Sequence, residues 1–385
     1  MSNGNCIEKY VYILGAGFSA PLGIPVMKNF LSKAKDQFSI APKEYEHFSH
    51  TFNEINKLHE CAYHYDCDIG NIEEILSILL TLDNIKGTNN SSSFKKFIKD
   101  VIEFYTPDKS KLDIVNPNCV LPHIKNEYKL SPYAKFVSSA FNFDYSVKNK
   151  KVSFKGTEVK LNLLEDFKRM ESNTNHSFIT LNYDLVLETV LKNINQRFQT
   201  NYSFCKEDTP DYSVPCLAKI HGCISDSDSI IPPTWNKGDL NPANEKAWKL
   251  AGRLLHNAHH IIIIGYSLPE TDSYIKYLLK SSCISDNGSY TNLKSIKVFD
   301  KFPYCKEKYV DFIKNFSPEK DFYEYDIGSL LEHLSTTHCN SFKNGIDFKS
   351  AIYSLNSAQT PYLPKLENHI TNLIDKRIMD KVKPL

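Results

Sequence analysis

The stretch from Tyr10 to Ala20 has the residue types and the spacing of a site for a nucleotide diphosphate. An apolar run, Tyr10–Leu14, leads directly into two glycines and then into a helix start. Glycines allow a tight turn and a close approach of the backbone to an anion, and a helix start presents unpaired N–H groups and the positive end of the helix dipole. We therefore expect a diphosphate to bind the loop of Gly15, Ala16, Gly17, Phe18 and Ser19.

Polar residues that could do chemistry follow four further apolar runs. Asn182 and Asp184 come after the first run, His221 and Gly222 after the second, Gly265 and Ser267 after the third, and Asp300 ends the fourth. Amide, imidazole and carboxylate groups are the usual side chains that orient a ribose or move a proton.

The elements that would position these residues alternate between strand and helix. Apolar patterning predicts strands over 10–14, 177–181, 216–220, 260–264 and 293–299, and helices over 26–38, 185–198, 242–258, 269–279 and 306–316. Four consecutive isoleucines, Ile261–Ile264, suit a central parallel strand that is covered on both faces. The alternation predicts an α/β fold with a Rossmann-like, doubly wound parallel sheet. Ligands bind at the carboxyl ends of such strands, so we expect the polar residues to share one crevice.

Between the predicted helix 26–38 and the predicted strand 177–181, the sequence predicts a separate helical part. Apolar spacing looks helical from 41 to about 170 and is clearest over Asn71–Leu82. We therefore divide the chain into a nucleotide-binding catalytic domain (1–40 and 171–327), a large helical insertion (41–170) and a helical C-terminal tail (328–385), whose best-patterned part is Leu363–Met379.

The spacing Gly15-x-Gly17-x-x-Ala20 also fits the fingerprint of NAD-dependent dehydrogenases. Such enzymes need an acidic residue about 20 positions further on, at the end of a second strand. The acid nearest to that position, Asp36, lies inside the predicted helix 26–38, and no predicted strand follows it. The sequence therefore disfavours hydride transfer.

Taken in order, the motifs resemble those of the sirtuin-like family. That family has a Gly-Ala-Gly-x-Ser loop, a Gly-Ile-Pro, an Asn-x-Asp, a His-Gly and a Gly-x-Ser. In this chain they stand at 15–19, 23–25, 182–184, 221–222 and 265–267. The resemblance covers the chain from Tyr10 to about Asp300 apart from the insertion, and it implies that the ligand is NAD.

One departure from the family narrows the expected activity. Protein deacylases of this family carry a zinc module with two Cys-x-x-Cys pairs after the His-Gly, but here that interval holds only Cys223. No zinc is expected, and the chain is similar to the zinc-free bacterial branch, many of whose members are NAD glycohydrolases in anti-phage defence. The resemblance thus implies NAD depletion by a homo-oligomer, with a HerA-like ATPase or another sensor protein as a possible partner.

Hydrolysis of NAD makes defined demands on a site. Nicotinamide leaves the ribosyl cation as a neutral molecule, so the reaction does not need the two carboxylates of ordinary glycosidases. It needs a diphosphate cradle, a polar group on the ribose and a base that titrates near neutrality. We expect Asn182 to orient the ribose and a water, and His221 to act as the base. The other expected NAD contacts are Pro25, Asp184, Gly265 and Ser267, with Asp300 on the adenosine ribose.

Structural roles compete with several of these assignments. Gly15 and Gly17 could serve a tight turn without a phosphate, and Asp184 could cap the helix that follows it. His256, His259 and His260 are expected to be surface or helix-end residues away from the crevice. The cluster His59-x-Cys61-x-x-His64-x-x-Cys67 has four soft ligands, but on one helix they would point to more than one face, so no metal is expected.

Composition limits the partners. The chain of 385 residues has 46 Lys and Arg against 45 Asp and Glu, so its net charge of +1 provides no field that would attract nucleic acid or an anionic membrane. The N-terminal residues lack the pattern of a signal peptide, apolar runs are shorter than a membrane helix, and the ten cysteines form no Cys-x-x-Cys pair. We expect a cytoplasmic protein.

Two other functions stay open beside NAD hydrolysis. The chain could be a nucleotide-binding sensor or nuclease-associated module, or a protein-lysine deacylase. The presence of both Asn182 and His221 favours catalysis, and the missing zinc module favours water as the acceptor. Because a constantly active NAD hydrolase would harm its host, we also expect the insertion or the tail to restrain it.

Overall fold

The computed structural model describes residues 7–107, 131–154, 157–232, 241–270, 272–281, 284, 292–313, 319–324, 326–327 and 330–331. The predicted tail 328–385, including Leu363–Met379, therefore lies outside the described residues apart from Leu330 and Leu331.

Six parallel strands form the central sheet in the order β5-β4-β1-β6-β7-β8. They are β1 (Glu8–Leu14), β4 (Thr174–Thr180), β5 (Leu217–Lys219), β6 (His260–Ile264), β7 (Ser295–Asp300) and β8 (Glu319–Glu324). The chain adds strands outward from β1 first in one direction and then in the other, which is the order of a doubly wound Rossmann sheet. The predicted fold class is confirmed, and β8 is an additional strand that the apolar pattern did not predict.

The two central strands bury side chains on both faces of the sheet. Tyr10, Tyr12 and Leu14 pack into one hydrophobic core, whereas Val11 and Ile13 pack into the other. The isoleucines of β6 divide in the same way, with Ile262 and Ile264 on one face and Ile261 and Ile263 on the other. Full burial of one such side chain stabilises the fold by about 1.5–3 kcal/mol, so this doubly covered pair of strands is a firm base for the loops that follow it.

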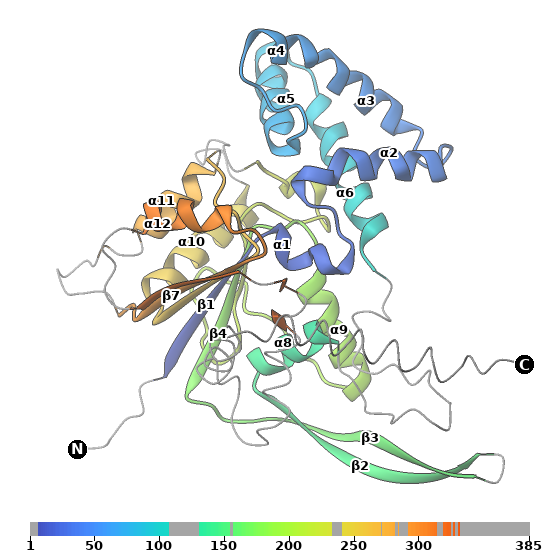
Figure 1. Ribbon diagram of the computed structural model, residues 1–385, viewed down its shortest axis with the longest axis vertical. Helices are drawn as coiled ribbons and strands as arrows, with labels where there is room; N and C mark the ends of the chain where they lie inside the picture. Colours follow the sequence, from blue (N-terminus) through green and yellow to red (C-terminus); the bar gives the residue numbers. More distant parts are fainter. Residues whose placement is uncertain are drawn as a thin grey trace, which may run out of the picture.

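Helices cover both faces of the sheet (Figure 1). The first face packs against α8 (Pro132–Ala140) and α9 (Val186–Phe198), and the second against α10 (Pro242–His256), α11 (Ser273–Ser281) and α12 (Tyr304–Phe312). One face of α10, with Leu250, Ala251, Leu254 and Leu255, is buried. The cap residue Asn241 precedes this helix, and its side chain accepts the N–H of Asn244 at 2.9 Å. Asparagine is among the preferred residues at a helix start, and Pro242 fits the first helical position.

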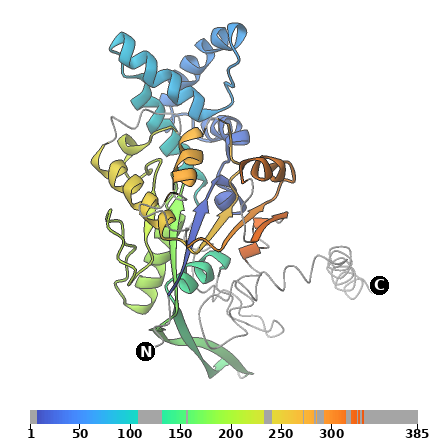
Figure 2. The same ribbon diagram turned by 90° about the vertical axis from the view of Figure 1, so that its left-hand side faces the viewer.

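The insertion forms a helical group beyond the end of the sheet where α1 (Ala16–Ser19) lies (Figures 1 and 2). This group contains α3 (His47–Lys57), α4 (His59–His64), α5 (Ile72–Lys86) and α6 (Asn90–Tyr105). The helix α2 (Phe30–Ile40), preceded by the short η2 (Met27–Asn29), belongs to the same group but comes before the predicted start of the insertion at residue 41. An aromatic cluster that includes Phe48, Phe52 and Phe97 packs at its centre. The predicted helical structure of this part is confirmed.

The prediction of helical structure is wrong for residues 143–169, which form strands. Two antiparallel strands, β2 (Phe143–Phe154) and β3 (Thr157–Arg169), form a hairpin at the opposite end of the molecule from the helical group (Figure 1). Val159, Leu161 and Leu163 alternate with Lys160 and Asn162, and this period of two is typical of a strand. The domain boundaries at 40/41 and 170/171 stay a prediction.

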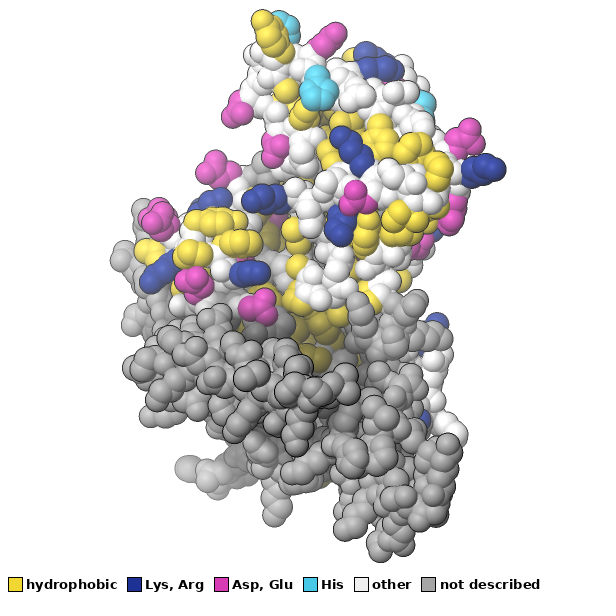
Figure 3. Space-filling view, turned by 45° about the vertical axis from the view of Figure 1, so that its right-hand side comes forward, with side chains coloured by type: hydrophobic (Ala, Val, Ile, Leu, Met, Phe, Trp, Pro, Cys, Tyr) yellow, Lys and Arg dark blue, Asp and Glu magenta, His cyan; other side chains and the backbone are white. Residues whose placement is uncertain are grey.

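Two further properties of the described residues are the distribution of surface charge and the length and polarity of the helices. Over the coloured part of the face shown in Figure 3, Lys and Arg side chains are interspersed with Asp and Glu side chains. Among the described helices, none is long and apolar enough to cross a membrane.

Candidate active site

Three glycines bring the loops after β1 and β6 into backbone contact, at the point where the strand order reverses. The N–H of Gly15 donates to the carbonyl of Ile264 at 3.0 Å, and the N–H of Gly17 donates to that of Gly265 at 2.9 Å. A Cβ on Gly15 would lie 2.5 Å from the carbonyl oxygen of Gly265, and Gly265 itself has φ +62°. These positions therefore require glycine because one backbone lies directly on the other.

Part of the predicted diphosphate loop is already hydrogen-bonded within the protein. The N–H of Gly17 is used as described, and the N–H of Phe18 donates to the carbonyl of Gly15 at 2.9 Å. The Phe18 side chain is buried, and its carbonyl accepts the hydroxyl of Tyr133 at 2.6 Å. Ala16, in contrast, is exposed. Phe18 thus has a clear role in the core, and its contact with a ligand stays a prediction.

Asn182 joins the end of β4 to this loop. Its side-chain nitrogen donates to the carbonyl of Gly15 at 2.9 Å and to the hydroxyl of Ser19 at 3.2 Å, and its backbone N–H donates to Thr180 Oγ1 at 3.1 Å. The residue is 8% exposed. Because three hydrogen bonds hold it, Asn182 presents a fixed amide at the carboxyl edge of the sheet.

Asp184 lies in the turn between β4 and α9. It is buried, its Oδ1 accepts the N–H of Val186 at 3.0 Å, and it is hydrogen-bonded to the Ser19 side chain. Burial raises the pKa of the Asp184 carboxyl, and the positive charge of Lys219 opposes that rise. The structure therefore gives Asp184 the helix-start contact that was the alternative to a ligand contact.

His221 follows β5, the strand next to β4, which Asn182 follows. Thr180 pairs with Lys219 at the ends of β4 and β5, and the N–H of Ile220 donates to the carbonyl of Thr180 at 3.3 Å. Asn182 and His221 each come two residues after that pair, so the register puts both at the same edge of neighbouring strands. A bond of 3.0 Å from the N–H of Ile224 to the carbonyl of Tyr183 ties the two following loops together. His221 itself is 2% exposed.

Gly222 allows the next loop to fold back over His221. Gly222 has φ +90°, and a Cβ there would lie 1.9 Å from the carbonyl oxygen of Ser229. The N–H of Ile231 then donates to the carbonyl of His221 at 3.0 Å. The His-Gly pair is thus explained by a close backbone approach that buries the imidazole.

The remaining predicted NAD contacts lie outside this hydrogen-bonded group. Ser267 is partly buried after β6, and Pro25 is buried before η2. Asp300 ends β7, where its carboxylate accepts the N–H of Phe302 at 2.9 Å and burial raises its pKa. The positions of Ser267 and Asp300 at strand ends agree with the predicted crevice, and the contacts of all three residues with NAD stay predictions.

Two charged residues near the site were missed at the sequence level. Lys219 binds the carbonyl of Asp184, and Glu73 stands in the first turn of α5. Burial, together with the negative charge of Asp272, raises the pKa of Glu73 to about 8. Asp272 is itself buried and accepts the hydroxyl of Tyr266 at 2.6 Å. Acidic residues are ordinary in a first helical turn, so no sequence signal distinguishes Glu73 from Glu74.

The raised pKa of Glu73 predicts a pH-dependent stability. In the unfolded chain a glutamate releases its proton near its usual pKa, whereas folded Glu73 keeps it up to about pH 8. The folded state therefore loses stability as the pH rises through that interval. We expect Glu73→Gln to be more stable than wild type at pH 8, by on the order of 1–3 kcal/mol, and to match it near pH 4.5. Chemical denaturation at several pH values measures this. Glu103→Gln, on the exposed side of α6, is the control, and parallel curves for wild type and Glu73→Gln would refute the assignment.

His259 and His260, and the possible metal ligands, lie outside the candidate site. His259 and His260 are each 8% exposed, so their assignment to the surface is wrong. They lie at the amino end of β6, where His260 stacks on Tyr10 and its Nε2 is 3.1 Å from Glu8, so they are indeed away from the crevice. Among the described residues, no group of three or more His, Cys, Asp or Glu side chains could hold a metal.

Part of the chain matches a known family model. Residues 176–308 match the SIR2-like domain, a span that contains Asn182, His221 and Gly265. None of the curated protein sequences matches the chain. Among solved structures, the chain is similar to Sir2 in complex with the inhibitor EX-527, 2'-O-acetyl-ADP-ribose and a deacetylated p53 peptide, at 12% identity over 86% of this chain and 94% of that chain, with a TM-score of 0.34. It is equally similar to Sir2Tm bound to a propionylated peptide, at 12% identity, the same coverage and a TM-score of 0.34. The domain match supports a sirtuin-like assignment for this part of the chain.

Proposed function

We propose that this chain is a sirtuin-like NAD glycohydrolase, which cleaves the nicotinamide–ribose bond with water. The observation that carries the proposal is the convergence of three elements at one sheet edge. Asn182 is hydrogen-bonded to the glycine loop, and His221 follows the adjacent strand at the same register. An amide, a base and an anion-binding loop are the parts that this reaction needs.

The chain's own residues would share the chemistry as follows. Both side-chain bonds of Asn182 use its nitrogen, so its Oδ1 is the atom that would accept a hydrogen bond from a ribose hydroxyl or a water. As nicotinamide leaves with the electron pair of the glycosidic bond, the ribosyl carbon becomes cationic. His221 would take a proton from the attacking water. The reaction then balances as NAD and water giving nicotinamide, ADP-ribose and a proton.

The loop after His221 supports water rather than a protein side chain as the acceptor. The described part of this loop, residues 222–232, is closely bonded: the N–H of Cys223 donates to Ser229 Oγ at 3.0 Å, and Asn244 donates to the carbonyl of Ser229 at 2.8 Å. Lys95 of the insertion donates to the carbonyl of Asp228 at 3.1 Å, so α6 covers the same loop. The sequence between Gly222 and Gly265 contains one cysteine, Cys223, so it lacks the two Cys-x-x-Cys pairs of a zinc-binding peptide module.

Product analysis tests the proposal against its two alternatives. The purified full chain is incubated with NAD, with and without an acetyl-lysine peptide, and the products are separated by chromatography. We expect equal amounts of nicotinamide and ADP-ribose whether or not the peptide is present. Release of nicotinamide only with the peptide, together with an O-acyl-ADP-ribose, would instead identify a deacylase. NAD binding without any product would identify a nucleotide-binding module.

The biological role is also a proposal. We propose that the hydrolysis depletes cellular NAD in bacterial anti-phage defence, through a homo-oligomer or with a HerA-like ATPase or other sensor as a partner. The support is the order of the sequence motifs and the absence of the zinc module. Measuring cellular NAD after phage infection, with and without an intact His221, tests this role: a fall in NAD that depends on His221 is expected, and an equal level in both strains would contradict it.

A further inference from the structure

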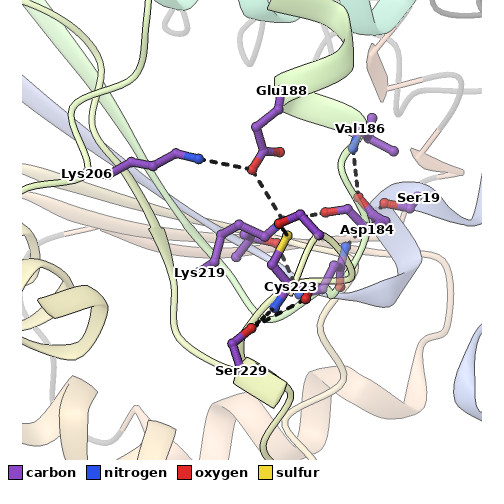
Figure 4. A network of polar contacts seen from close by, with 11 residues as sticks. Ser19, Asp184, Val186, Glu188, Lys206, Lys219, Cys223 and Ser229 are labelled. Carbon is purple, nitrogen blue, oxygen red and sulfur yellow. Dashed lines mark hydrogen bonds and ion pairs between the residues drawn. The ribbon is translucent and has the colours of Figure 1, made fainter. Parts of the chain in front are cut away.

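Lys219 is a buried cation that lies beside the turn carrying Asn182 and Asp184 (Figure 4). It is the last residue of β5, and its side chain is 10% exposed. Its ammonium donates a hydrogen bond to the carbonyl of Asp184 and lies 3.6 Å from the Glu188 carboxylate. Lys206 approaches the same carboxylate at 3.5 Å. Glu188 is thus held between two lysines, and only Lys219 also reaches the turn.

The surroundings of Lys219 keep it charged. Burial alone lowers the pKa of this lysine, but Glu188, together with Cys223 and Asp184, raises it above the usual lysine value. Loss of the ammonium would leave a buried carbonyl without its donor and would remove one of the two cations beside Glu188, and both changes are costly in a poorly solvated place.

The groups that face the Asp184 carboxylate come from several elements. The hydroxyl of Ser19 in α1 and the N–H of Val186 in α9 are hydrogen-bonded to it, and Lys219 of β5 faces it with a positive charge. Glu188 of α9 opposes its ionisation, and Tyr133 of α8 is close enough to be affected by its charge. Lys219 is therefore the cation among these groups that favours the ionised form.

We propose that Lys219 is a positioning residue, whose buried ammonium fixes the Asn182–Asp184 turn against β5 through the carbonyl of Asp184. This inference rests on the proposed function, because the turn it holds carries the amide that would orient the ribose. Through Lys219, strand β5, which His221 follows, is bonded to the turn, and through Asn182 the turn is bonded to the glycine loop. One lysine thus links the three parts of the site.

The first test is a titration that does not depend on catalysis. Lys219→Met keeps the length of the side chain and removes its charge, whereas Lys219→Arg keeps the charge. The carbon NMR signal of the Asp184 carboxyl, assigned with Asp184→Asn, is followed against pH. We expect its midpoint to rise by about one pH unit or more in Lys219→Met and to stay near the wild-type value in Lys219→Arg. An unchanged midpoint in folded Lys219→Met would overturn the inference.

A second variant covers the case in which Lys219→Met does not fold. Lys219→Gln also removes the charge, but its side-chain amide can still donate a hydrogen bond toward the turn, so the midpoint should again move up. No upward shift in folded Lys219→Gln would overturn the inference.

The second readout is the rate of NAD hydrolysis in the two Lys219 variants. We expect kcat to fall about 10–100-fold in Lys219→Met, because a misplaced amide fails to orient the ribose, and to be largely kept in Lys219→Arg, which retains the charge and the donors. Equal losses of kcat in Lys219→Met and Lys219→Arg would reduce Lys219 to a merely structural role. If the wild-type protein cleaves no NAD, the proposed function fails, and the titration still decides whether Lys219 controls Asp184.

Discussion

Replacing His221 by alanine is expected to slow NAD cleavage by about 10²–10⁴-fold, the usual contribution of a general base. His221 is 2% exposed and comes two residues after β5, as Asn182 comes two residues after the neighbouring β4. Without it, water would have to attack the ribosyl carbon without a base. Initial rates of nicotinamide release, measured for wild type and variant at equal protein concentration, give the effect.

A matched histidine provides the control for this prediction. His256 is exposed at the end of α10, before β6 and therefore away from the carboxyl edge of the sheet. His256→Ala should keep the wild-type rate. Asn182→Ala should lose activity as His221→Ala does, and the double variant should be little slower than either single one, because residues that act as a unit are not additive. Equal rates for His221→Ala and wild type would remove the imidazole from the mechanism.

Replacing Gly222 by alanine is expected to destabilise the protein by about 3 kcal/mol or more. A left-handed backbone costs a residue other than glycine about 1–2 kcal/mol, and the forced contact adds a similar or larger amount. The added Cβ would lie 1.9 Å from the carbonyl oxygen of Ser229, and the loop that must shift also carries the bond from Ile231 to His221. We therefore expect a lower melting temperature and a loss of activity together.

Gly87 separates backbone strain from close contact. It ends α5 with φ +66°, and a Cβ there would meet no atom within 4 Å. Gly87→Ala should therefore cost only the strain of about 1–2 kcal/mol and leave the activity intact. Thermal and chemical denaturation of both variants measure the difference. If Gly222→Ala cost no more than Gly87→Ala, the approach of Ser229 to Gly222 would be wrong.

The central sheet could be predicted from the sequence because its inner strands are unambiguous. Ile261–Ile264 can be covered on both faces only in the middle of a sheet, and the polar residues that follow each apolar run mark the strand ends. Strand β8 was missed because its residues, Glu319–Glu324, include four charged ones, and an apolar pattern cannot detect such an edge strand. The hairpin of β2 and β3 was missed because its alternation was taken for helical spacing.

The sequence predicted where the site lies better than it predicted which residues form it and what each of them does. The sequence shows that Gly15 and Gly17 are glycines, but only the fold shows that Gly265, about 250 residues later, is the backbone they must avoid. Lys219 and Glu73 have ordinary types at ordinary positions. Their importance comes from long-range burial and from neighbours such as Glu188 and Asp272, which the order of residues does not reveal.

The most direct test of the NAD-cleaving crevice is a crystal structure of His221→Ala with NAD bound, since a variant without the base should keep its substrate intact. We expect the nicotinamide ribose to lie beside Asn182 and the space left by the imidazole, with the diphosphate near the exposed side of the loop Gly15–Ser19 and near Ser267. NAD bound elsewhere on the protein, or a nicotinamide ribose out of reach of both Asn182 and the His221 position, would contradict the proposal.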